Sequence, residues 1–124
     1  MPVRRQVTDA DRVWNRACSG EEADWREGDQ ALRSVLLVNG YIQNGGVCHA
    51  FDLPADELTM GIAGYEFFGL HELAAIIQPH EGEDEEAYNK RYYQLEGIHG
   101  SIISEKFNEM FHRHPERFAP LSAQ

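Results

Sequence analysis

The residues best suited to chemistry are two neighbours, Cys48 and His49, which directly follow a pair of glycines. A cysteine and a histidine can act as nucleophile and base only when they touch in space and a third group orients the histidine. Adjacency in sequence provides neither condition, so Cys48 is better interpreted as a small packing residue. An enzyme that uses Cys48 and the histidines is kept as the third of three hypotheses on function.

The remaining histidines do not complete a metal motif. His71-Glu72 begins like the helix motif of zinc proteases, but Ala75 stands where the second histidine belongs. His112 and His114 lie two residues apart on an expected helix and therefore point in different directions. This spacing suits neither chelation nor a proton relay.

Two further segments lack the features of an ion or phosphate site. Gly45-Gly46 is followed by no Lys-Ser/Thr pair and preceded by no strand, so it is no phosphate loop. The acidic run 81–86 lacks the alternating ligands and the glycine position of a calcium loop. We therefore expect no catalytic residue, no metal and no cofactor.

The elements that would position these residues are helices, because apolar residues recur at helical spacing and no stretch alternates with a period of two. The expected helices cover about residues 9–18, then Asp29 to Asn44-Gly45-Gly46, 47–51, Pro54 to Gly69, Leu70 to Pro79, a segment with Tyr88, Tyr92 and Leu95 on one face, and Ile102 to His114. This pattern predicts a compact all-α domain of about six or seven helices. We expect residues 1–28 to form an N-terminal helix and linker, and residues 29–124 to form the helical body of one globular unit.

Glycines mark two positions in this scheme. Asn44-Gly45-Gly46 is expected to be a structural turn that ends the long central helix, since glycine adopts left-handed backbone conformations at low cost. Gly61 and Gly64 weaken their own helix by about 1 kcal/mol each, so we expect them to permit close contact between helices.

The charge of the chain is strongly negative and unevenly distributed. The net charge is −10, and residues 27–89 alone carry twelve acidic residues against the single base Arg33. Such a field repels nucleic acid and anionic membranes and attracts basic surfaces. The simpler interpretation is that the charge keeps the protein in solution. The candidate partner-binding acids are Asp52, Asp56, Glu57, Glu66, Glu72, Glu81, Glu83, Asp84, Glu85 and Glu86.

The chain has the features of a cytoplasmic protein of bacterial type. It contains no apolar run near the ~20 residues that cross a bilayer, and no apolar stretch follows Arg4-Arg5 as in a secretory signal. Cys18 and Cys48 are too few and too far apart for a disulfide framework.

The order of features resembles a family of small bacterial domains of unknown function named after a DNA-mimic protein. The resemblance covers roughly residues 30–118. It is carried by the apolar helix into Asn44-Gly45-Gly46, Phe51, the segment 63–70, Ala74-Ala75 and the closing segment 114–118. The family pattern usually has an aromatic residue after the two glycines, where this chain has Val47. The resemblance implies an all-α fold and, from the founding member, carboxylates that imitate DNA phosphates.

Two non-enzymatic hypotheses lead. In the first, the chain is a DNA mimic or other acidic domain that binds a basic protein, for example a DNA-binding protein, and does not bind nucleic acid directly. In the second, it is an immunity- or antitoxin-like or accessory protein that binds one cognate partner through a mixed interface with a buried aromatic anchor.

Overall fold

The computed structural model describes residues 7–19, 24–78, 84–97 and 101–121. All regular elements in these ranges are helical, which confirms the predicted all-α class. The seven α-helices are α1 (Asp9–Ser19), α2 (Glu27–Gly45), α3 (Val47–Ala50), α4 (Ala55–Phe67), α5 (His71–Ile76), α6 (Glu85–Glu96) and α7 (Ser101–Arg113), followed by the 3₁₀ helix η2 (Pro115–Arg117).

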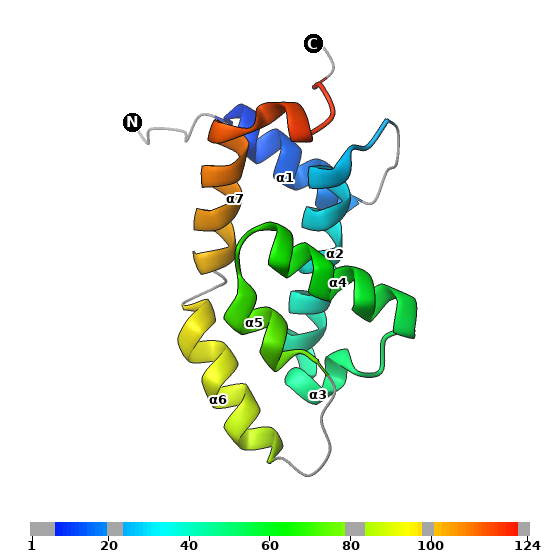
Figure 1. The fold of residues 1–124 in the computed structure, drawn as a ribbon, viewed down its shortest axis with the longest axis vertical. Coiled ribbons are helices and arrows are strands. Elements are labelled where there is room, and N and C mark those ends of the chain that lie inside the picture. The colour runs from blue at the N-terminus through cyan, green and yellow to red at the C-terminus, as the bar shows by residue number, and fades with distance from the viewer. Residues whose placement is uncertain (1–6, 20–23, 79–83, 98–100, 122–124) are drawn as a thin grey trace, which may run out of the picture.

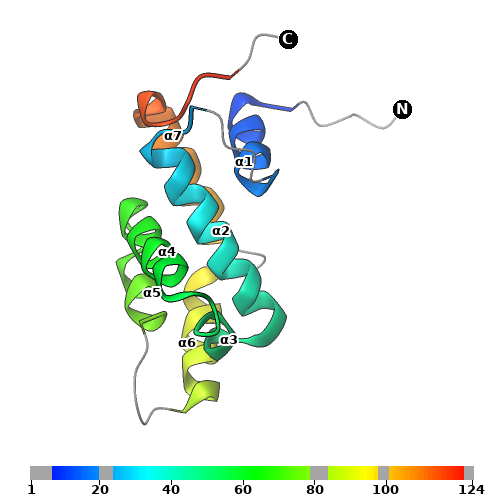
Figure 2. The ribbon, with the colours of Figure 1, turned by 90° about the vertical axis from the view of Figure 1, so that its right-hand side faces the viewer.

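The long helix α2 is the centre of the fold. It packs most extensively on α4, and it also contacts α1, α3 and η2 (Figures 1 and 2). Helix α5 lies between α4 and α6, and α6 leads into α7. Leu32, Val35, Val38 and Ile42 are fully buried along α2. Leu36 is half-exposed, so this helix is not buried on all sides.

Close contact between α2 and α4 depends on the two predicted glycines. A Cβ atom on Gly61 would lie 2.3 Å from Cγ2 of Val38, and one on Gly64 would lie 2.7 Å from the carbonyl oxygen of Ala31. Real Cβ atoms do not approach neighbouring atoms so closely, so the spacing of the two helices requires glycine at both positions. The prediction that these glycines permit helix–helix contact is confirmed.

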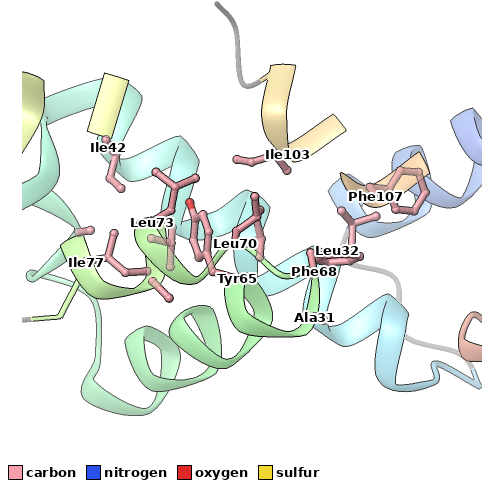
Figure 3. Close-up of a cluster of buried hydrophobic side chains, with 14 of the residues drawn as sticks. Ala31, Leu32, Ile42, Tyr65, Phe68, Leu70, Leu73, Ile77, Ile103 and Phe107 are labelled. Atoms are coloured by element: carbon pink, nitrogen blue, oxygen red, sulfur yellow. The ribbon is translucent and has the colours of Figure 1, made fainter. Parts of the chain in front are cut away.

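The core is rich in aromatic side chains, which come from α4, α6, α7 and the segment after η2. Figure 3 shows Tyr65, Phe68 and Phe107 among aliphatic residues from α2, α5 and α7. Phe107 contacts Phe118 edge to face, with 5.6 Å between the two ring centroids. Phe118 is 2% exposed, so the chain folds back onto the core after η2.

On α6 the buried face differs from the prediction at one position. Tyr88 and Tyr92 are buried as expected, but Leu95 is 38% exposed and the next residue, Glu96, is 2% exposed. The amide nitrogen of Gln43 donates to both carboxylate oxygens of Glu96, at 2.7 and 2.8 Å. This pairing allows a charged residue to replace leucine on the inner face, because a buried carboxylate needs hydrogen-bond donors.

A buried acid also joins the two ends of the fold. Asp29, where the second helix was expected to begin, lies in the first turn of α2 because the helix begins two residues earlier at Glu27. Its carboxylate accepts hydrogen bonds from the Arg16 guanidinium, from the backbone N–H of Arg26 at 3.1 Å and from that of Ala119 at 2.6 Å. Helix α1, the start of α2 and the C-terminal segment therefore meet at one carboxylate.

Two tyrosines form a buried polar contact between α4 and α6. The hydroxyl groups of Tyr65 and Tyr92 hydrogen-bond at 2.5 Å, and the Tyr92 hydroxyl also donates to Oδ1 of Asn39 at 2.8 Å. Burial raises the pKa of Tyr65 and of Tyr92 above the usual value for tyrosine. The nearby carboxylate of Glu96 raises both pKa values further, by electrostatic repulsion of the ionised phenol.

These raised pKa values predict that the fold loses stability in alkaline solution. In the unfolded chain a tyrosine ionises near pH 10, while the folded chain keeps the proton, so stability is fully present below pH ~10 and falls as pH rises above it. The fall is expected to reach at most about 1.4 kcal/mol per pH unit for each tyrosine. Urea unfolding measured from about pH 9 to 11 should show a shallower pH slope in the double variant Tyr65→Phe/Tyr92→Phe, even though that variant is less stable at neutral pH. An unchanged slope would contradict the assignment.

Candidate functional site

The predicted acidic residues lie on exposed helix starts and turns. Asp52 follows α3, Asp56 and Glu57 begin α4, Glu66 lies near its end, Glu72 begins α5, and Asp84, Glu85 and Glu86 begin α6. Seven of these eight side chains are exposed, and Glu57 is half-exposed. Glu81 and Glu83 fall outside the described residues. Asp29 also belongs to the acidic segment 27–89, but it is buried and therefore adds no exposed carboxylate to the surface.

The structure brings some of these carboxylates together and separates others. Asp52 and Glu85 both act electrostatically on Cys48, so the end of α3 and the start of α6 carry neighbouring negative charges. Glu66 lies nine residues beyond Glu57 on α4, which corresponds to about 14 Å along the helix. Asp52 and Glu85 therefore form one group at the end of α3 and the start of α6, and Glu66 lies apart from the acids at the start of α4.

Few of these charges are neutralised. Asp52 approaches His49, with 3.5 Å between Oδ2 and Nδ1. No ion pair links the other seven to a cationic side chain within the described ranges. Several of the seven stand in the first turn of a helix, where the helix dipole stabilises a negative charge. Oδ1 of Asp84 also accepts the N–H of Glu86 at 3.1 Å, so Asp84 caps α6.

The Asn44-Gly45-Gly46 segment forms a tight link between α2 and α3. Helix α2 ends at Gly45, and Gly46 has φ 87° and ψ 176°, a combination essentially confined to glycine. The side chain of Asn89 on α6 lies against this turn, and its Oδ1 accepts the N–H of Val47 at 2.7 Å. The turn thus fixes α6, and the acidic residues at its start, relative to α3.

Replacing Gly46 with alanine is expected to destabilise the fold by about 1–3 kcal/mol, because alanine adopts this backbone conformation only under strain. The new Cβ would also lie 2.9 Å from the amide nitrogen of Asn89. Gly69→Ala is the matched control, since Gly69 also has positive φ (77°) but has no atom within 4 Å of the Cβ position. Thermal denaturation should show the larger loss for Gly46→Ala, and equal losses would exclude a specific role for the Asn89 contact.

The arrangement around Cys48 opposes nucleophilic chemistry. Partial burial raises the pKa of the Cys48 thiol, and the negative charges of Glu85 and Asp52 raise it further. A nucleophilic cysteine needs the opposite, a lowered pKa beside positive charge. The ring of His49 stacks on Tyr41 with 5.0 Å between ring centroids and approaches Asp52. These contacts provide no partner that would activate the thiol.

Metal binding finds no support in the described part of the chain, where no three His, Cys, Asp or Glu residues are placed to hold an ion. His71, His112 and His114 are exposed.

The sequence did not predict a cleft of about 820 Å³ between α1 and α7, which is lined in part by Trp14, Phe107 and Phe111. Its two walls are about ninety residues apart in the chain, and no local pattern reports such a pairing.

Comparison with models of known protein families, with curated proteins and with solved structures finds no match for this chain. Among the described residues, no helix combines the length and the apolar character that a membrane crossing requires.

Proposed function

We propose that this chain is a non-enzymatic acidic binding domain that occupies a basic surface of another protein in the cytoplasm. The observation that supports this most is the set of exposed carboxylates after α3 and at the starts of α4, α5 and α6, of which only Asp52 has an ionic partner within the described ranges. Unpaired surface charge of one sign attracts an oppositely charged surface over roughly 10 Å at moderate ionic strength.

The more specific form of the proposal is DNA mimicry. Duplex DNA carries one charge per ~1.7 Å of its axis, and a mimic presents carboxylates in place of those phosphates. The group formed by the end of α3 and the start of α6 is the best candidate for this role, because Asp52 and Glu85 converge there. The expected partner is a basic protein such as a DNA-binding protein.

A second function is supported by a different observation. Two large apolar side chains, Met60 on α4 and Tyr93 on α6, are 45% and 39% exposed. An immunity- or antitoxin-like protein that binds one cognate partner would use such side chains as anchors in a mixed interface. Binding of this kind should change little with salt.

Charge reversal tests the electrostatic form directly. Glu85→Lys/Glu86→Lys changes the net charge by +4 and leaves the capping residue Asp84 in place. We expect this variant to capture fewer basic proteins from a nuclease-treated cell lysate than the unmodified chain, because it removes two adjacent carboxylates from the α6 start. Captured proteins are eluted with a salt gradient and identified by mass spectrometry.

The matched control is Glu105→Lys/Glu109→Lys on α7, which makes the same charge change on two exposed residues far from the α6 start. Equal losses in both variants would mean that capture depends on total charge and on no particular surface. Full retention by Glu85→Lys/Glu86→Lys would remove the start of α6 from the interface.

A further inference from the structure

A shallow apolar groove runs between α2 and α4. Its volume is about 200 Å³. Small residues form its floor, because Ala31, Ser34 and Gly64 are buried where the two helices touch. Met60 and Phe67 stand along its α4 wall. The same close approach that requires glycine at position 64 therefore also creates the groove.

The α4 wall presents an apolar stripe at helical spacing. Met60, Ala63 and Phe67 follow one another at intervals of three and four residues, so they align on one side of the helix. Met60 is 45% exposed and Ala63 is also exposed, while Phe67 is half-buried. Methionine is flexible and polarisable and adapts to the shape of an incoming apolar surface. This stripe matches the grooves that accept one face of an amphipathic helix.

Carboxylates flank the stripe. Glu27 lines the groove on α2. On α4, Asp56 stands one turn before Met60, and Glu66 directly precedes Phe67. All three side chains are exposed, and none forms an ion pair within the described ranges.

Two arginines lie at the Phe67 end, and both have contacts of their own. The guanidinium of Arg117 lies 5.5 Å from the centroid of the Phe67 ring. Nη1 of Arg26 donates to the carbonyl oxygen of Glu116 at 2.9 Å. The apolar stripe is therefore flanked by carboxylates that form no ion pair within the described ranges. At its Phe67 end lie two arginines that already have other contacts.

We propose that this groove binds an amphipathic basic helix of the partner protein. Apolar side chains of that helix would pack against Met60, Ala63 and Phe67, and its lysines or arginines would face Glu27, Asp56 and Glu66. The inference rests on the proposed function and adds to it the kind of segment that is bound. Charge complementarity selects this occupant, because an acidic or neutral helix would leave the three carboxylates unpaired or repelled.

The test uses a synthetic 18-residue helical peptide with leucines on one face and lysines on the other, labelled for fluorescence anisotropy. Met60→Glu is the diagnostic variant of the full chain. It blocks the apolar stripe and adds negative charge, so attraction by charge alone would become stronger. We expect Met60→Glu to weaken peptide binding by about 10-fold or more, the effect of losing a central anchor.

Leu95→Glu is the matched control, because Leu95 is similarly exposed (38%) but lies on α6. We expect the Kd of this variant for the peptide to stay within about twofold of that of the unmodified chain. Such a change is small beside the tenfold loss expected for Met60→Glu. A twin peptide with glutamate in place of lysine should not bind. Circular dichroism should show that both variants keep their helix content, since both sites are exposed.

The possible outcomes separate the groove from the wider proposal. If Met60→Glu binds the peptide as well as or better than Leu95→Glu, the groove is excluded while salt-sensitive binding elsewhere on the acidic surface still stands. If Met60→Glu abolishes peptide binding, but the binding to the unmodified chain does not change with salt, the groove binds an apolar helix and the proposal of a basic helix is wrong. If the chain alone sediments as a dimer that Met60→Glu dissociates, the groove belongs to a second copy and the inference is overturned.

Discussion

Gly64→Leu is expected to lower the free energy of unfolding by about 3 kcal/mol or more, which is a large part of the 5–15 kcal/mol that stabilises a typical domain. The reason is that even the Cβ of the new side chain would lie 2.7 Å from the backbone carbonyl of Ala31 and 3.0 Å from Cγ2 of Val35. A backbone carbonyl inside α2 has no room to move, so α4 would have to separate from α2. Urea denaturation followed by circular dichroism measures the loss.

The control for this prediction is Gly40→Leu. Gly40 is also inside a helix, but it is exposed and no atom lies within 4 Å of its Cβ position. Removing glycine from an exposed helix position should stabilise the chain by up to about 1 kcal/mol. The two substitutions are thus expected to have opposite signs. A stability change at position 64 no larger than at position 40 would show that α2 and α4 are not in the described contact.

Asp29→Ala is expected to cost about 3–5 kcal/mol, because it breaks a buried ion pair and leaves its partners without an acceptor. The side chain of Asp29 is 1% exposed, and that of Arg16 is 20% exposed. The backbone N–H groups of Arg26 and Ala119 would also lose their acceptor. Urea denaturation measures this loss of stability. We expect the loss because α1 and the C-terminal segment both attach to the start of α2 through Asp29.

Asp56→Ala provides the comparison, since it removes an exposed carboxylate without an ion pair in the described ranges. We expect it to cost less than about 1 kcal/mol, the usual limit for a charge at a helix start. Similar losses for Asp29→Ala and Asp56→Ala would be inconsistent with a buried junction at Asp29. Arg16→Ala combined with Asp29→Ala should cost less than the sum of the two single changes, because both remove the same contact.

Local patterns in the sequence were sufficient to predict most of the helices. Thr8 and Asp11 cap α1 reciprocally, with both hydrogen bonds at 3.1 Å, as the Thr-x-x-Asp spacing indicates. Gly46 ends the α2 region in a conformation that favours glycine. Each of these signals depends only on residues close together in the chain, and this explains why sequence alone could reveal them.

The predictions that failed depended on partners distant in the chain. Leu95 was expected on the buried face of α6, but Glu96 is buried instead, because Gln43, fifty-three residues earlier, donates hydrogen bonds to its carboxylate. Asp29 belongs to the acidic segment 27–89, but it is buried because Arg16 and Ala119 enclose its carboxylate. The cleft between α1 and α7 and the groove between α2 and α4 likewise arise from tertiary packing. Composition predicted the amount of negative charge but not which carboxylates share a face.

The central proposal is that the exposed carboxylates occupy a basic surface of another protein. The most direct measurement is a competition experiment on the complex between this chain and the basic protein that it captures most strongly, titrated with duplex DNA at several salt concentrations. We expect that DNA displaces the chain, and that the affinity between the two proteins falls steeply as salt increases. A complex that persists at high salt and binds DNA at the same time would contradict it.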